Sequence, residues 1–194
     1  MIILTKDEFL TSKKKFFKEL ENSIFIHPTD SSYRLGCNAT KPELVEKLRN
    51  IKRNNIMPFT VIVPSKDWIN TNFSLTKAQK KYVEKLGKRI SIDGKEHSVT
   101  LILDLKNKDC VAKNVAPGSD SLGVKIPEHW FSDIVNELGF PIVSTSANIG
   151  GSDLIESSED IPVEIKNSIS LAIFEEKGSI YPITTFRPYG YKSL

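Results

Sequence analysis

Hydroxyl, amide and basic side chains follow several apolar segments of this chain, in positions where they could bind an anionic ligand. The apolar run 140–143 (FPIV) is followed by 144–148 (STSAN) and then by Gly150 and Gly151. The run predicts a short buried strand, and the glycines allow a ligand to approach the backbone closely. Ligands of open α/β sheets bind at the carboxyl ends of strands, so this segment is the first candidate site. The alternative is a turn whose Ser, Thr and Asn side chains only cap the next segment.

A second segment, 27–37 (HPTDSSYRLGC), repeats the pattern of an apolar strand followed by small hydroxyls and an acid. Further hydroxyls, at Thr100 and in the pair 184–185, stand at other predicted strand ends. Basic residues lie beside predicted turns, at Lys52, Arg53, Lys125, Arg187 and Arg34. Arg and Lys in such places bind phosphates or carboxylates by charge-assisted hydrogen bonds. Each cation alone is better explained as a solvated surface charge, except Lys125, which interrupts an otherwise apolar strand just before a helix. Together they predict a pocket that accepts anions with hydroxyls and cations rather than with a metal cage.

Several common catalytic motifs are absent from the sequence. Gly118 and Gly123 have the spacing of a phosphate-binding loop, but Val124 stands where the lysine should follow. There is no G-x-G-x-x-G motif, and no serine lies in a G-x-S-x-G elbow. The three histidines are scattered without metal-ligand spacing, so no protein-bound metal is expected.

The composition is that of a soluble globular protein. The chain has 194 residues, with 39% hydrophobic and 26% charged residues, and is long enough for one domain, which we expect to span 1–194. A net charge of +3 is too small to indicate nucleic acid by itself. Cys37 and Cys110 favour free thiols in a reducing compartment, with a single disulfide as the alternative. With neither a secretory signal nor an apolar run of about 20 residues, a cytoplasmic location and no membrane contact are expected.

Alternating strands and helices predict a single α/β domain with a mixed sheet. Capping boxes at Thr5, Thr40 and Thr76 predict three helix starts, and Pro127 and Gly139 predict the first and last turns of another helix. The segment 107–121 is expected to be a loop. Strands are predicted at 24–26, 59–63, 99–103, 122–126, 140–143, 169–174 and 181–187.

These segments, in this order, resemble the motifs of the YrdC family over almost the whole chain. Segment 28–37 resembles the family's P-T-D-[ST]-x-Y-G-L-G, and segment 99–103 resembles its V-T-[LF]-[IV]-L strand. Segment 122–127 resembles G-V-R-[IV]-P, and segment 144–151 resembles [ST]-x-S-A-N-x-x-G. Lys52, with a proline and a strand after it, resembles the family's K-x-R segment.

The resemblance implies a twisted, mixed open sheet with helices packed on it and a positively charged concave face. It implies a nucleotidyltransferase, a threonylcarbamoyl-AMP synthase that joins L-threonine, bicarbonate and ATP and releases pyrophosphate. Mg²⁺ would arrive with ATP. The product would pass to a downstream threonylcarbamoyl transferase complex that modifies tRNA next to the anticodon, with weak RNA binding by this chain as a further expectation.

Carried over residue by residue, the resemblance also implies roles for individual side chains. The residues expected to bind the substrates are Ser31, Thr100, Lys125, Ser144 and Thr184. Those expected to bind the nucleotide are Lys52, Arg53, Ser146, Asn148 and Arg187, and of these Lys52 and Arg53 would be catalytic. Either Arg53 or Asn54 takes the place of the family's second basic residue. Arg34 stands where the family has glycine, and Lys125 where it has arginine.

Two alternatives remain at this point. A YciO-like paralogue would share the P-T-D-S-x-Y motif and the Phe59-Thr60 strand start, but have a different activity. A non-catalytic module that binds double-stranded RNA would use the basic face alone. The small hydroxyls at strand ends suit small ligands better than stacked bases.

Overall fold

The computed structural model describes residues 1–54, 56–149, 153–176 and 181–188. Its strands are β1 (Ile2–Thr5), β2 (Phe25–His27), β3 (Arg34–Asn38), β4 (Thr60–Ile62), β5 (Phe73–Ser74), β6 (Ile90–Ile92), β7 (Lys95–Leu105), β8 (Ser121–Lys125), β9 (Ile142–Ser146), β10 (Leu171–Phe174) and β11 (Ile183–Phe186). Its helices are α1 (Lys6–Asn22), α2 (Pro42–Lys52), α3 (Lys66–Asn72), α4 (Lys77–Val83), α5 (Phe131–Leu138) and α6 (Val163–Lys166), with a 3₁₀ turn at Lys113–Val115.

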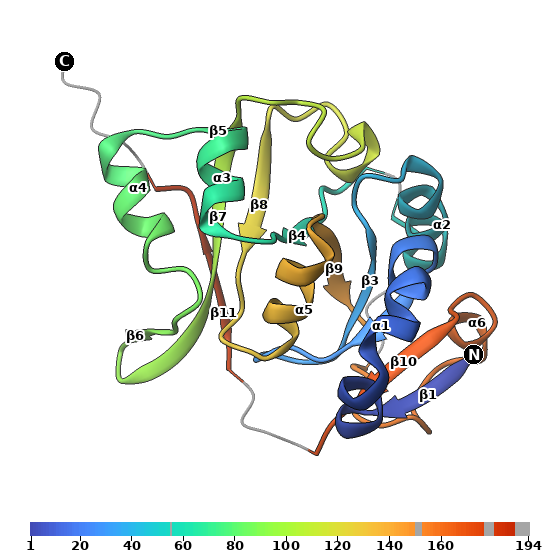
Figure 1. Ribbon diagram of the computed structural model, residues 1–194. Coiled ribbons are helices and arrows are strands. Elements are labelled where there is room, and N and C mark those ends of the chain that lie inside the picture. Colours follow the sequence, from blue (N-terminus) through green and yellow to red (C-terminus); the bar gives the residue numbers. More distant parts are fainter. Residues whose placement is uncertain (55, 150–152, 177–180, 189–194) are drawn as a thin grey trace.

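The strands form one mixed sheet in the order β1-β10-β2-β3-β9-β4-β8-β7-β11. The pairs β1/β10, β10/β2, β4/β8 and β7/β11 are parallel, and the central strands β2, β3, β9 and β4 pair antiparallel. Figure 1 shows β1 and β10 side by side at one edge of the sheet and β7 and β11 at the other. The long strand β7 also pairs with the short strands β5 and β6. The predicted α/β fold with a mixed sheet is therefore confirmed.

Two of the predicted capping boxes are confirmed and one is wrong. Thr5 and Thr76 both accept a hydrogen bond from the backbone three residues on, and each receives the reciprocal bond. The helix α2 begins instead at Pro42, whose preset φ suits the first helical position. The N-cap residue is Lys41, and no side chain caps this helix; the Thr40 hydroxyl donates to Asn38 Oδ1 over 2.7 Å.

The helix predicted from Pro127 begins later, at Phe131. The carbonyl of Pro127 accepts a hydrogen bond from Ser132 Oγ over 2.8 Å, which holds this segment as a turn ahead of the helix. The predicted end is confirmed, because Gly139 takes a left-handed conformation at φ 75°.

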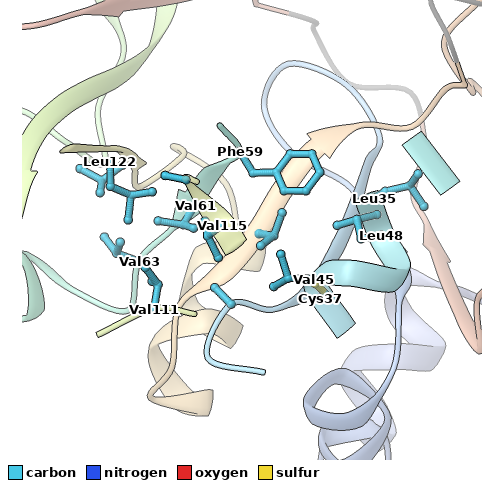
Figure 2. Packing of buried hydrophobic residues seen from close by; sticks show 14 of the residues in the cluster. Leu35, Cys37, Val45, Leu48, Phe59, Val61, Val63, Val111, Val115 and Leu122 are labelled. Atoms are coloured by element: carbon cyan, nitrogen blue, oxygen red, sulfur yellow. The ribbon is translucent and has the colours of Figure 1, made fainter. Parts of the chain in front are cut away.

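Each face of the sheet carries its own hydrophobic cluster. Alternation along the strands points Val61, Val124 and Leu101 to one face, where they pack with α2 and the 3₁₀ turn; Figure 2 shows part of this cluster. Ile62 and Ile142 point to the other face, where the second cluster joins them to residues of α1 and α5. The second cluster covers only part of its face, and the remainder is polar.

Both cysteines are free, as expected, and Cys37 is buried. Burial raises the pKa of the Cys110 thiol to about 11. Within the part of the chain that the structure describes, no helix is long and apolar enough to cross a membrane.

Candidate active site

Side chains from six neighbouring strands share the polar part of the second face. Strand partners across a sheet point to the same side, so the register identifies these side chains directly. Ile62, which belongs to the second hydrophobic cluster, pairs with Lys125 and with Ile142, and therefore fixes the side. The polar face is lined by Arg34, Ser144, Ser146, Thr60, Lys125, Thr100 and Thr185.

Gly123 leaves space on the polar face that a larger residue would fill. A Cβ atom on Gly123 would lie 2.8 Å from Thr60 Cγ2 and 3.6 Å from Thr100 Cγ2. The Thr60 hydroxyl donates to the carbonyl of Ser144 over 3.0 Å, which ties β4 to β9. The Ser144 hydroxyl itself is buried and has no hydrogen-bond partner among the described residues. A buried hydroxyl without a partner is costly, so this atom is suited to receive a ligand.

Hydrogen bonds from Lys52 connect the C-terminal end of α2 to the C-terminal end of β9. Its Nζ donates to the carbonyl and hydroxyl oxygens of Ser146 over 2.8 and 3.2 Å. It also donates to the carbonyl and Oδ1 of Asn148 over 2.5 and 2.7 Å. Desolvation, and then the nearby charge of Arg34, lower the pKa of Lys52 to about 8. The structure thus brings together three of the residues predicted to bind the nucleotide.

Lys125 is the most deeply buried cation of the site. Its side chain is 2% exposed, and desolvation together with Arg34 lowers its pKa to about 7, against the opposing attraction of Asp30. The prediction that Lys125 differs from an ordinary surface lysine is confirmed. A buried lysine with this environment takes up a proton readily when an anion binds beside it.

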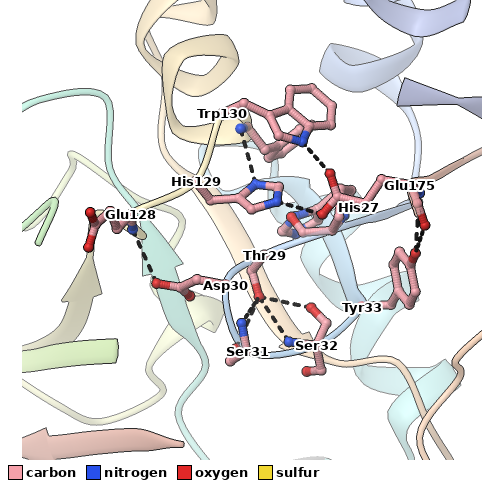
Figure 3. Close-up of polar contacts among 12 residues, drawn as sticks. His27, Thr29, Asp30, Ser31, Ser32, Tyr33, Glu128, His129, Trp130 and Glu175 are labelled. Atoms are coloured by element: carbon pink, nitrogen blue, oxygen red, sulfur yellow. Dashed lines mark hydrogen bonds and ion pairs between the residues drawn. The ribbon is translucent and has the colours of Figure 1, made fainter. Parts of the chain in front are cut away.

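The loop 28–33, which ends beside Arg34 of the polar face, lines a cavity of about 240 Å³. Thr29 Oγ1 holds the loop, because it accepts from the backbone nitrogens of Ser31 and Ser32 (Figure 3). Asp30 is buried and its Oδ2 accepts from the backbone nitrogen of Glu128 over 3.1 Å. Of the predicted site residues, only Ser31 lines this cavity, and its Oγ accepts a hydrogen bond from Arg34 Nη2 over 3.1 Å.

The sequence did not indicate a second set of residues at this cavity, a set that is centred on Glu175. Glu175 bonds His129 Nε2 over 2.8 Å and accepts from Trp130 Nε1 over 2.6 Å. The Tyr33 hydroxyl donates to the Glu175 carbonyl over 3.0 Å, so β10 is linked to the loop 28–33 (Figure 3). Partial burial raises the pKa of the Glu175 carboxyl, but the hydrogen bonds from His129 and Trp130 together with nearby positive charge outweigh it, so the pKa is lowered. The partners of Glu175 lie 45 to 142 positions away in the sequence, and no local motif indicates them.

Three residues that were predicted to belong to the site are not among those that line the polar face. They are Thr184, Arg53 and Arg187. Thr184 pairs with Val99, on the face opposite to Thr100, and its hydroxyl lies 2.8 Å from His97 Nδ1. Its neighbour Thr185 pairs with Thr100 and occupies the polar face instead.

Arg53 is the left-handed cap of α2 and lines a separate hollow with Lys47 and Glu164. The amide of Asn54 is engaged with the backbone of Met57. Arg187 is exposed, pairs with Asp104 over 3.1 Å and donates to a serine hydroxyl of β8.

Some of the predicted features lie outside the described residues. These are Gly150 and Gly151 of the first candidate segment and the Tyr189-Gly190 end of the late segment. Among the residues that are described, no group of three or more His, Cys, Asp or Glu could hold a metal ion. The positively charged face and the single domain 1–194 stay predictions.

Comparison with known proteins identifies what the chain resembles. The Sua5/YciO/YrdC family, described as telomere recombination, matches residues 20–184. A putative threonylcarbamoyl-AMP synthase of Methanocaldococcus jannaschii is 30% identical over 158 residues, which is 79% of this chain and 68% of that protein. The structure of P. abyssi Sua5 complexed with L-threonine superimposes with a TM-score of 0.76 at 18% identity, covering 96% of this chain and 54% of that chain. E. coli YciO gives a TM-score of 0.70 at 18% identity, covering 96% of this chain and 88% of that chain. The chain thus spans about half the length of Sua5, and these two structures confirm the predicted fold.

Proposed function

The chain belongs to the Sua5/YciO/YrdC family, and we propose that it is a threonylcarbamoyl-AMP synthase. In this proposal it joins L-threonine, bicarbonate and ATP to give threonylcarbamoyl-AMP and pyrophosphate. The product serves a downstream transferase complex that acts on tRNA, and the enzyme works in the cytoplasm. Support comes from relatives named putative threonylcarbamoyl-AMP synthase and threonylcarbamoyl-AMP synthase, and from the similar fold of P. abyssi Sua5 complexed with L-threonine.

The observation that carries the proposal is the position of Lys52. Its ammonium is held on four oxygens of Ser146 and Asn148, at the border of a face that also holds Arg34 and Lys125. A fixed cation beside further cations and donors is the arrangement that phosphoryl chemistry requires, because the reaction needs positioning and charge neutralisation more than covalent participation.

The proposed reaction assigns a task to each group. Protonated bicarbonate loses water to give carbon dioxide, which adds to the threonine amine with release of a proton. The resulting carbamate oxygen attacks the α-phosphate as pyrophosphate leaves. Lys52 and Lys125 stabilise the negative charge on the phosphates, and the hydroxyls of Ser144 and Thr100 hold the amino acid and the nucleotide. Mg²⁺ enters with ATP as part of the substrate and neutralises charge on the triphosphate.

The test is threonine-dependent release of pyrophosphate. Purified protein with ATP, L-threonine, bicarbonate and Mg²⁺ is expected to release pyrophosphate, and omission of threonine is expected to abolish the release. Lys52→Met is expected to lower kcat/KM about 100-fold or more, by analogy with the loss of one transition-state donor. Lys47→Met is the matched control, because Lys47 is an exposed lysine of the same helix.

Two results would contradict the proposal. Release of pyrophosphate that does not depend on threonine would indicate a different activity, as for an altered paralogue. Salt-sensitive binding of double-stranded RNA without any turnover would indicate a non-catalytic RNA module.

A further inference from the structure

Arg34 lies in the polar face although it is not among the residues predicted to bind substrate. It is the first residue of β3 and pairs with Ser146 on one side and with His27 on the other. Its Nη2 donates to Ser31 Oγ over 3.1 Å, whereas its Nε is buried without a hydrogen-bond partner among the described residues. A guanidinium has five N–H donors in a planar fork, so most of its donors remain for a ligand.

The charges around Arg34 are not balanced. Burial is the largest cause of the lowered pKa values of Lys52, Lys125 and His27, and the positive charge of Arg34 lowers all three further, so Arg34 is a common neighbour of these groups. Among the ion pairs between described residues, none includes Arg34, Lys52 or Lys125. Asp30 is the one carboxylate whose charge favours the protonated forms of Arg34 and Lys125. Three cations close to a single carboxylate repel one another until an anion joins them.

The arginine that follows Lys52 in the sequence does not contribute to this cluster. Arg53 is exposed and lines a different hollow, and the Asn54 amide is occupied by Met57. Of the described arginines, Arg34 is therefore the one that stands next to the Ser146 bound by Lys52.

We propose that Arg34 binds the polyphosphate of the nucleotide and supplies the guanidinium that Arg53 and Asn54 do not bring to the polar face. The inference rests on the proposed function and deepens it. Nη2 remains bonded to Ser31 and fixes the side chain, while Nε and the other Nη donors bond phosphate oxygens. Lys52 and Lys125 provide point charges, and Arg34 adds the planar, bidentate contact that a lysine cannot make. The buried Ser144 hydroxyl, which has no partner among the described residues, lies on the same face and is suited to donate to the same anion.

Calorimetric titration with pyrophosphate tests the assignment directly. Arg34→Gln removes the charge but keeps an amide that can donate to Ser31, and Arg53→Gln removes an arginine only 19 positions away in the sequence but outside the face. Arg34→Gln is expected to weaken pyrophosphate binding by at least about tenfold, which corresponds to about 1.4 kcal/mol. Arg53→Gln is expected to stay within about twofold of the unaltered protein, because it loses only an exposed charge. Arg34→Lys keeps the charge without the fork and is expected to fall between the unaltered protein and Arg34→Gln.

The titration of the neighbouring Lys125 distinguishes a structural role for Arg34 from a binding role. Loss of a like charge raises the pKa of Lys125, so Arg34→Gln is expected to move the NMR titration of the Lys125 side chain to higher pH. If Arg34→Gln does not fold, the pyrophosphate affinities of Arg34→Lys and Arg53→Lys are compared instead, and only Arg34→Lys is expected to bind more weakly than the unaltered protein.

The outcomes for Arg34 and for the proposed function are distinct. Equal pyrophosphate affinity in Arg34→Gln and the unaltered protein, or no pyrophosphate binding at all, overturns the assignment of Arg34. Arg34-dependent pyrophosphate binding in a protein that shows no threonine-dependent turnover supports Arg34 and overturns the synthase proposal.

Discussion

The burial of Lys125 predicts a specific pH dependence of stability. The pKa of Lys125 falls from its ordinary value of 10.5 to about 7 in the native state. Between these values the unfolded chain binds more protons than the native protein, so native stability rises with pH in this window. At 1.36 kcal/mol per pKa unit, the depressed pKa destabilises the ligand-free native protein by about 4 kcal/mol at pH 7 and about 2 kcal/mol at pH 9. Lys125→Met removes the titration and preserves most of the volume, so it is expected to stabilise the protein by about these amounts.

Urea unfolding at pH 7 and pH 9 measures the effect as a double difference. The advantage of Lys125→Met over the unaltered protein should shrink by about 2 kcal/mol from pH 7 to pH 9, and the pH dependence of Lys52 cancels in the comparison. Lys47→Met, at an exposed position, is the control and should give the same difference at both pH values. A Lys125→Met advantage that does not change with pH would refute the argument, because it would mean that Lys125 titrates near its ordinary pKa.

Three further predictions follow from the site. Pyrophosphate affinity is expected to fall as pH rises from 7 to 9, because Lys125 and Lys52 lose their protons over this range; calorimetry in buffers of different ionisation enthalpy should record proton uptake on binding. Gly123→Ala is expected to destabilise the protein by about 1–3 kcal/mol in urea unfolding, because the new methyl group meets a side chain of β4 at 2.8 Å; unchanged stability would contradict this close approach. Glu175→Ala is expected to cost about 1–3 kcal/mol, because it leaves Trp130 Nε1 without its acceptor, and the near-ultraviolet circular dichroism of the tryptophan should change.

The sequence predicted those parts of the fold that depend on local chemistry. The capping boxes at Thr5 and Thr76 and the glycine at position 139 act on neighbouring backbone groups, so their patterns are sufficient. The strands β1 and β3 were not predicted. β1 lies at the sheet edge with Ile2 and Ile3 exposed, and β3 contains polar and glycine residues and pairs on one side with β9, which is distant in the sequence.

The site was predictable where residue type and strand ends coincide. Lys52, Ser146 and Asn148 do meet, and Ser144, Thr100 and Lys125 do share a face, as the motifs suggest. Side-chain direction was not predictable at the last strand, because a one-residue difference in register decides whether Thr184 or Thr185 joins Thr100. The position of Arg53 depends on a left-handed helix cap, which no spacing rule indicates at a non-glycine residue.

The pairing of β3 with β9 has a consequence for how the protein is made. Arg34 pairs with Ser146, and Gly36 pairs with Ser144, so the centre of the sheet joins residues about a hundred positions apart. A growing chain on the ribosome therefore leaves one hydrogen-bonding edge of β3 unpaired until β9 has emerged, and the centre of the sheet closes late in synthesis. Because β1 and β2 also pair with β10, three strands of the amino-terminal third keep an unpaired edge until late in synthesis, and unpaired strand edges favour aggregation of a nascent chain.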